Sequence, residues 1–471
     1  MSAKVKILLG PAVAALCIFV LPFSLAQNAA VGIALWMVAW WSTQVLPIGA
    51  TALLPLVMFP AFGVSGFAET ASNYANPIIF LFFGGFVLGL ALEKRGLHRR
   101  FALHILRAAR ERPFAVIAGF SAASAILSMW ISNTATAVMM LPIGISVIHL
   151  LEKQFPEAST RRRFAVSLLL SLAVSANIGG TATLIGTPPN LVLAGILSDT
   201  YGTEIGFAQW FFFTAPLAAA LFFVALLINT KVIFRVPNLN MYGMRQMTRN
   251  ELEKMGHLRT AEKRVALVFL LTAGLWIFRA PLSKLPGLGF VSDALIAVFS
   301  ALLLFSVGDG RKKRLMGWED MKRMPWDILL LFGGGLSIAA GLTATGTVEL
   351  LGSAFSAFDA VHWLIFVLFA VAVAVMLTEL MSNVAMTAML LPVVIAAAEA
   401  AGGHMMTMAV ALTIGASCAF MLPIATPPNA VVFSATYIRS ADMAKLGFWL
   451  NLISIALITA YCYAIAPLWF S

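Results

Sequence analysis

The chain has 471 residues, of which 61% are hydrophobic and only 11% are charged, and its mean hydropathy is +0.93. This composition excludes a soluble globular domain. Continuous apolar runs such as "ILLGPAVAALCIFVLPF" and "FFFTAPLAAALFFVALLI" have the length of membrane helices, whereas an outer-membrane barrel shows short alternating strands. The sequence therefore predicts an all-α polytopic membrane protein.

The net charge of +11 comes from basic residues that gather in a few short connectors between apolar runs. These connectors cover residues 94–112, 161–163, 231–264 and 311–323. Because lysine and arginine are retained on the cytoplasmic side of a membrane, we expect these connectors and the N-terminus to be cytoplasmic. A nucleic-acid partner would need a basic face on a folded domain with stacking aromatics, so none is expected.

The first apolar run follows Lys4 and Lys6 and ends near "SLAQNAA". It could be a cleaved secretory signal, but a second apolar run begins almost at once, so a retained first span is favoured. We expect residues 1–76 to form the N-terminal spans of a scaffold. Cys17, Cys418 and Cys462 lie in apolar surroundings without metal-ligand spacing and are interpreted as packing residues.

Residues 77–240 form the first predicted repeat. It contains a hairpin over residues 114–151, interrupted at "SMWISNTATAVMMLP", and a broken helix over residues 165–199, interrupted at "GTPPN". Basic residues flank the hairpin on both sides, which indicates a re-entrant segment that enters from the cytoplasm and returns to it. Residues 241–323 follow as a cytoplasmic connector with linking spans.

Residues 324–471 form the second predicted repeat. The hairpin over residues 361–401 carries "TELMSNVAMTAMLLP", and the broken helix over residues 405–438 carries "ATPPN". Lysine and arginine are absent between residues 324 and 438, so this hairpin is expected to enter from the outer face. A last span then leaves the C-terminus outside.

The motifs of the two halves match in order. Asn133 and Asn383 stand 250 residues apart, the two "FGG" motifs (residues 83–85 and 332–334) stand 249 apart, and "GTPPN" and "ATPPN" stand 239 apart. Chance Ser-Asn pairs at helix contacts are the alternative, since small polar residues are common there. Three matches with opposite predicted orientation favour an inverted-topology repeat, which places transport sites at broken helices near the bilayer midplane.

The breaks suit the binding of both anions and cations. A helix that resumes at "SNTA" directs free N–H groups and its positive dipole end into the break, where an anion is favoured. The half-helix that stops there exposes carbonyl oxygens which, with Ser and Asn oxygens, suit Na⁺. Thr187 and Thr426 can cap the next helices, with Pro188 and Pro427 at their first positions. Glu379 is either a functional carboxylate or a buried acceptor of backbone N–H groups.

The Ser-Asn tips and the segment "SCAFMLPIATPPNAVV" (residues 417–432) resemble the divalent anion/sodium symporters, which carry dicarboxylates, citrate or sulfate. The resemblance implies about eleven spans with two re-entrant hairpins, a homodimer through a scaffold domain, an elevator-like movement and two sodium sites. Their ligands would be Ser128, Ser132, Asn133 and backbone near Gly186, and Thr378, Ser382, Asn383 and backbone near Ala425. The substrate would meet Asn133, Thr134, Thr187, Asn383, Val384 and Thr426, where Val384 replaces the threonine of the family pattern.

The expected function is therefore secondary transport across the bilayer, in a bacterial inner membrane: symport of Na⁺ with a divalent anion, most simply a C4-dicarboxylate such as succinate or malate. A sodium-independent exchanger of dicarboxylates or tricarboxylates, and a transporter of sulfate or another oxyanion, remain alternatives on the same fold. An enzyme is not expected, because the chain has no H-E-x-x-H motif and its six histidines lie away from the breaks.

Overall fold

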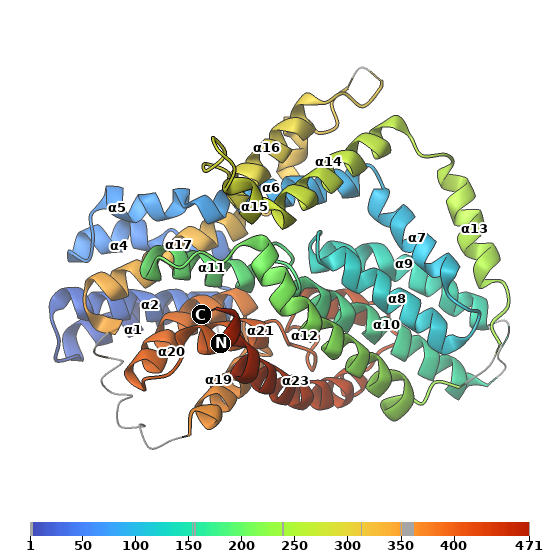
Figure 1. The fold of residues 1–471 in the computed structure, drawn as a ribbon. Coiled ribbons are helices and arrows are strands. Elements are labelled where there is room, and N and C mark those ends of the chain that lie inside the picture. The colour runs from blue at the N-terminus through green and yellow to red at the C-terminus, as the bar shows by residue number, and fades with distance from the viewer. Residues whose placement is uncertain are drawn as a thin grey trace.

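The computed structural model describes residues 3–152, 154, 157–237, 240–311, 313–348, 350 and 362–470. This part of the chain is folded into helices without a β-strand (Figure 1). Residue 361, the predicted start of the second hairpin, lies outside the described residues. The helices up to the first hairpin are α1 (Ala3–Val20), α2 (Leu25–Thr43), α3 (Ile48–Thr51), α4 (Leu54–Phe62), α5 (Phe67–Ser72), η1 (Asn73–Ala75), α6 (Pro77–Lys94) and α7 (Leu97–Ala108).

The central part of the chain contains the first hairpin, the first broken helix and the linking helices. These are α8 (Pro113–Ser128), α9 (Asn133–Glu152), α10 (Ala158–Thr181), α11 (Pro188–Tyr201), α12 (Phe207–Leu227), η2 (Ile228–Ile233), α13 (Met244–Met255), α14 (Thr260–Ile277), α15 (Arg279–Ser283), α16 (Asp293–Ser306) and η3 (Trp318–Arg323). The last part contains α17 (Trp326–Ala344), α19 (Trp363–Thr378), α20 (Asn383–Ala400), α21 (Met405–Ala416), α22 (Pro427–Phe433) and α23 (Ser440–Trp469).

Several helices begin at side chains that accept their first free N–H groups. Ser24 forms a capping box with Gln27 at the start of α2, and Asn76 accepts from the Ile78 N–H at the start of α6, where Pro77 occupies the first helical position. Such caps compensate donors that have no partner within the helix. Helix boundaries are therefore set locally, even though the helices lie in an apolar environment.

The fold has the dimensions of a polytopic membrane protein. Within the described residues, seven helical segments are long and apolar enough to cross a bilayer, and five shorter apolar helices accompany them, among them α8 and α19 of the hairpins. Large apolar side chains such as Phe19, which is 85% exposed, cover the outer surface, as expected where lipid rather than water is the neighbour. The all-helical membrane fold is confirmed, while the number of eleven spans stays a prediction.

The basic connectors lie together on one face of the molecule, which we call the basic face. Hydrogen bonds and ion pairs join three of the connectors to one another: Lys94–Asp320, Arg95–Leu315, Arg99–Glu251, Arg100–Glu262 and the Arg245 N–H with Glu111. Near the fourth connector, Gln154 bonds to Tyr242 and Arg162 pairs with Asp442. The connection of Arg162 to Asp442 extends this face to the start of α23. The charge pattern along the sequence and the tertiary contacts thus agree on which ends of the helices share a side.

The "FGG" motifs permit close approach between helices. A Cβ atom at Gly84 in α6 would lie 2.3 Å from the carbonyl oxygen of Ala297 in α16, and one at Gly334 in α17 would lie 2.6 Å from that of Ala52. Real Cβ atoms do not approach so closely, so these positions exclude any larger residue. Each motif therefore permits one close contact with the backbone of a neighbouring segment, although Gly84 and Gly334 are not at matching positions of the repeat.

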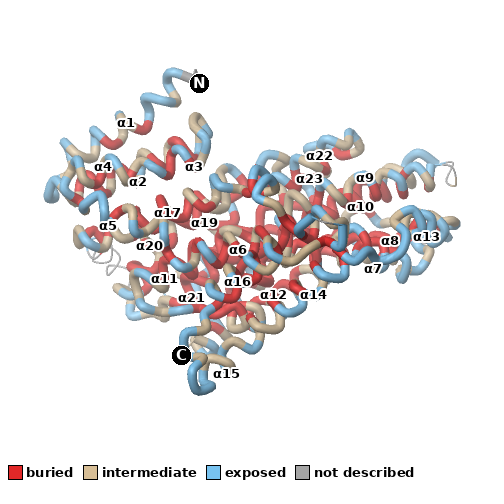
Figure 2. Tube along the Cα trace, turned by 90° about the horizontal axis from the view of Figure 1, so that it is seen from above, coloured by how far each residue is buried: buried red, intermediate tan, exposed pale blue. Residues whose placement is uncertain are grey.

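The two hairpins and the two broken helices interlock. Figure 1 shows the first hairpin (α8 and α9) and the second hairpin (α19 and α20) on different sides of the molecule. Helix α9 of the first hairpin packs against α22 of the second repeat, and α20 packs against α11 of the first repeat. Buried residues concentrate in the middle of the molecule, and the chain ends lie at opposite edges (Figure 2). Each repeat thus completes the core of the other.

Candidate functional site

Both hairpin tips and both helix breaks line one cavity of about 1130 Å³. The first repeat contributes residues around Asn133 and Gly186, and the second contributes residues around Asn383 and Ala425. Helices α9, α11 and α20 each begin at this cavity, so their N-terminal N–H groups and positive dipole ends favour an anion there. Sequence motifs that are 250 residues apart are brought to the same place.

The first tip is a cluster of oxygen atoms. Ser128 is fully buried and donates a hydrogen bond from Oγ to Oδ1 of Asn133. A Cβ atom at Gly180 would lie 2.6 Å from Asn133 Oδ1 and 3.1 Å from the Gly186 carbonyl oxygen, so the amide, the glycine backbone and the break between α10 and α11 meet. Hydroxyl, amide and carbonyl oxygens are the ligands that a hard cation prefers.

The second tip repeats this arrangement with different residues. Thr378 is fully buried, and its Oγ1 lies 2.7 Å from Oδ1 of Asn383 and 2.6 Å from the carbonyl oxygen of Ala416. Asn383 and Ala425 line the cavity. The hydroxyl–amide pair of the first tip, Ser128 with Asn133, is therefore matched by Thr378 with Asn383, as the predicted repeat requires.

The capping predictions are met at some positions and not at others. Ser132 accepts from the Ala135 N–H at 3.1 Å, and Thr426 accepts from the Asn429 N–H at 3.4 Å. Thr187 and Ser382 occupy the N-cap positions of α11 and α20, but their side chains make no capping hydrogen bond. These two hydroxyls line the cavity without serving as helix caps.

Thr134 and Val384 occupy corresponding positions in the first turns of α9 and α20, and both line the cavity. Val384 is partly buried and also packs against the hydrophobic core. At this one position the wall of the cavity thus carries a hydroxyl group at the first tip and methyl groups at the second, which makes the two tips chemically unequal.

Three asparagines next to the site were not singled out in the sequence. Asn190 donates to the Thr183 carbonyl at 2.8 Å, and Asn429 donates to the Leu422 carbonyl at 3.0 Å. Each ties the start of its helix to the break that precedes it, and the two stand 239 residues apart, like the motifs that contain them. Asn177 lines the cavity and donates to Thr426 Oγ1 at 3.1 Å, across the two repeats. A polar residue within an apolar helix was the available signal.

Glu379 is buried and holds the second break. Its Oε1 accepts from the N–H groups of Phe420 and Met421 at 2.7 and 2.9 Å and from the amide of Asn451 at 2.8 Å, and its Oε2 accepts from the Leu422 N–H at 3.1 Å. In the first repeat the corresponding link is made by Thr183, which donates to the Met129 carbonyl at 2.5 Å. Of the two interpretations, the structure shows the buried acceptor of backbone N–H groups.

The cavity reaches the basic face, where residues outside the hairpins line it. Glu93, His98 and Arg323 lie there, and Arg323 pairs with Glu93 at 2.8 Å. Burial lowers the pKa of His98, so its imidazole is neutral at neutral pH. Among the described residues of the lining, Arg323 therefore carries the one positive charge and Glu93 the one negative charge.

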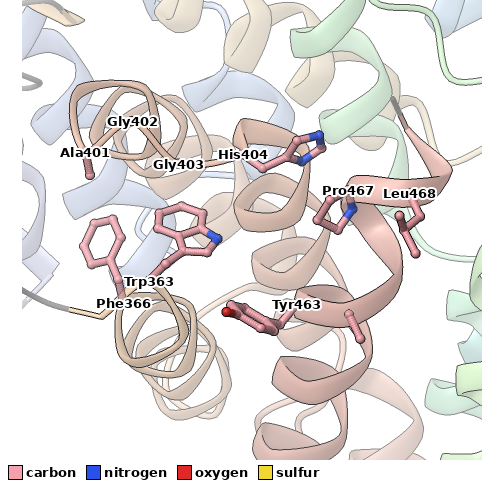
Figure 3. A pocket seen from close by; sticks show the side chains of 10 residues that line it. Trp363, Phe366, Ala401, Gly402, Gly403, His404, Tyr463, Pro467 and Leu468 are labelled. Atoms are coloured by element: carbon pink, nitrogen blue, oxygen red, sulfur yellow. The ribbon is translucent and has the colours of Figure 1, made fainter.

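A second cavity of about 520 Å³ lies between the N-terminal ends of α19 and α21 and the C-terminal end of α23 (Figure 3). Trp363 and Phe366 of α19 line it with their rings 5.7 Å apart, together with His404 and Tyr463. Within the described chain, none of the predicted sodium or substrate residues lines this cavity. Of these two cavities, only the first is lined by residues of the predicted site.

Comparison with known proteins places the chain in one family over almost its whole length. Residues 2–469 match the profile of the sodium:sulfate symporter transmembrane region. The sodium-dependent dicarboxylate transporter SdcS of Staphylococcus saprophyticus is 37% identical over 442 residues, which are 92% of this chain and 85% of that protein. SdcS of Staphylococcus aureus strain MRSA252 is 36% identical over 443 residues, with coverages of 93% and 85%.

Solved structures with the same fold are also membrane transporters. The YdaH transporter of Alcanivorax borkumensis superposes with a TM-score of 0.61 at 15% sequence identity, covering 93% of this chain and 98% of that one. MtrF of Neisseria gonorrhoeae gives 0.55 at 12% identity, with coverages of 95% and 96%. The family match confirms the resemblance seen in the motifs and identifies a transporter rather than an enzyme: the chain belongs to the sodium:sulfate symporter family, the divalent anion/sodium symporters.

Proposed function

We propose that this protein couples the movement of Na⁺ to symport of a divalent anion, and that the anion is a C4-dicarboxylate. The convergence of two hydroxyl–asparagine tips in one cavity carries the proposal. The oxygen clusters suit sodium, while the helix N-termini and the free hydroxyls of Thr187 and Ser382 suit carboxylates. The dicarboxylate named for SdcS and the sodium named for SdcS and for the family support this choice.

We assign the sodium sites to the two hydroxyl–asparagine tips and their breaks. One comprises Ser128, Ser132, Asn133 and the backbone at Gly186, and the other comprises Thr378, Ser382, Asn383 and the backbone at Ala425. Substrate carboxylates meet the helix starts between them. Binding of Na⁺ would increase the affinity for the dicarboxylate, and binding of the dicarboxylate would increase the affinity for Na⁺. The reason is that the cations reduce the repulsion between the two carboxylates in the shared cavity.

In this proposal the basic face and the N-terminus are cytoplasmic and the C-terminus lies outside. The contacts among the basic connectors support a single basic side, and retention of positive charge assigns that side to the cytoplasm. The cavity reaches the basic face, and with that face in the cytoplasm we interpret this conformation as an inward-facing state. An elevator-like movement of hairpins and broken helices in a homodimer would carry the site to the other side.

Uptake of radiolabelled succinate into proteoliposomes tests the function. We expect uptake to require an inward sodium gradient and to stop when K⁺ replaces Na⁺. Sodium-independent uptake that requires internal dicarboxylate would instead identify an exchanger. Uptake of sulfate, with no competition from succinate, would identify an oxyanion transporter and overturn the choice of substrate.

Val384 gives a prediction about the unequal ends of the cavity. We expect Val384→Thr to tighten succinate binding by about two- to twelvefold, because one hydrogen bond contributes roughly 0.5–1.5 kcal/mol. Calorimetric titration at saturating sodium measures the affinity, and thermal unfolding measures the stability. Val384→Ile is the control, since it adds volume without a donor. Unchanged or weaker binding together with a lower melting temperature would show that Val384 packs against the core and does not face the substrate.

A further inference from the structure

The ion pair of Arg323 and Glu93, at the basic end of the cavity, lies outside the two hairpin tips and the two helix breaks. Arg323 is the last residue of η3, and Glu93 lies in the last turn of α6. Both line the same cavity as Asn133 and Asn383. The tips themselves contain no lysine, arginine or histidine, so a dianion that passes between the tips and the basic face has one fixed cation in the described lining, Arg323.

The surrounding backbone fixes the position of Arg323. Asp320 accepts from the Gly317 N–H at 2.7 Å and pairs with Lys94 at 2.6 Å, which joins η3 to the end of α6. The indole of Trp326 donates to the Met321 carbonyl at 3.0 Å. These bonds hold the segment that carries Arg323 against the mouth of the cavity.

The two partners of the pair differ in exposure. The side chain of Glu93 is 15% exposed, whereas that of Arg323 is 59% exposed. The largely covered carboxylate of Glu93 keeps its place, while the solvated guanidinium of Arg323 can exchange one carboxylate for another with little change in free energy. Arg323 can therefore leave Glu93 and bind a carboxylate of the passing anion bidentately.

We propose that the Arg323–Glu93 pair is an affinity-setting element for the anion at the basic end of the cavity, where Arg323 attracts the dianion and Glu93 competes for Arg323. This inference rests on the proposed function. It predicts opposite effects for the two residues, since removal of the guanidinium weakens anion binding and removal of the carboxylate charge strengthens it. If the ion pair only stabilised the fold, removal of either residue would lower the stability of the protein, and the two changes would not have opposite effects on anion binding.

The test is titration of succinate into purified protein at saturating, fixed sodium. We expect Arg323→Gln to weaken and Glu93→Gln to tighten binding by about two- to fivefold each, the scale of an exposed charge pair. Added choline chloride should weaken binding by wild type more than by Arg323→Gln, because salt screens the lost attraction. Arg323→Lys, which keeps the charge but cannot bind a carboxylate bidentately, should weaken binding less than Arg323→Gln does.

Lys322→Gln is the matched control. It removes a positive charge from the neighbouring residue, which pairs with Glu319 and does not line the cavity, and it should leave the affinity unchanged. Equal affinities of Arg323→Gln and Lys322→Gln for succinate would overturn the inference. Sodium-dependent binding of succinate by the wild type would still support the proposed function in that case. If Arg323→Gln does not fold, Glu93→Gln decides alone, and unchanged or weaker binding contradicts the inference. Absence of sodium-dependent succinate binding by wild type would refute the proposed function and the inference with it.

Discussion

Replacement of either tip asparagine, Asn133→Ala or Asn383→Ala, is expected to abolish sodium-dependent uptake of succinate. Each amide lies in a cluster of oxygens at the cavity and bonds to the buried hydroxyl of Ser128 or Thr378. Hydrogen bonds to charged groups contribute about 1.5–3 kcal/mol, so the loss of one corresponds to about 10- to 150-fold in affinity. Because we assign each amide to both the ion and the substrate, transport should fall by more than either binding step alone.

Asn229→Ala is the control for loss of a buried amide. Asn229 is buried and donates to the Ser167 carbonyl at 2.9 Å, but it does not line the cavity. We expect this variant to lose stability and to keep the increase in melting temperature that sodium and succinate give wild type. The tip variants should lose that increase. Uptake above about half of the wild-type rate for either tip variant would contradict the assignment of its asparagine to the site.

Replacement of Glu379 by alanine is expected to have the largest effect on stability. Three backbone N–H groups and the amide of Asn451 would lose their acceptor inside the protein. Each buried donor without a partner costs about 1–3 kcal/mol, so the four donors give a total of at least about 4 kcal/mol. We expect Glu379→Ala to unfold at a markedly lower temperature in detergent and to yield little monodisperse protein.

Glu379→Gln separates the structural role from a role of the charge. Glutamine retains one oxygen acceptor, so part of the network persists, and we expect a folded variant that still transports. A folded Glu379→Gln variant without transport would show that the negative charge itself is required. The exposed Glu69→Ala serves as the control for loss of a carboxylate. A melting temperature of Glu379→Ala equal to that of wild type would contradict the network as a stabilising element.

Much of the site was predictable because its residues lie within short motifs. Ser128, Ser132 and Asn133 belong to one short motif. A second motif 250 residues later has the same order of polar groups, and this match is what indicated a duplicated binding site. Polar side chains within an apolar run are costly unless they have partners or a function, so they stand out in a membrane protein. The start of α9 at "SNTA" and the prolines at the starts of α11 and α22 are likewise local, and the structure has them where the sequence predicted.

Other features depend on contacts between segments far apart in the chain. The sequence left two interpretations of Glu379 open, because its partners Phe420 and Asn451 come from the second break and from α23. Asn177 likewise donates a hydrogen bond to Thr426 in the other repeat, a contact that the sequence around Asn177 does not reveal.

The sequence by itself determined the membrane class, the family, the duplicated tips and the basic side, because these follow from composition, motif order and the placement of charge. Only the tertiary structure decided that both tips share one cavity, that Glu379 binds the second break, and that Arg323 and Glu93 reach the same cavity. The physical reason is that a helix pattern specifies which face is buried, whereas the partner on that face is selected by packing among all the helices at once.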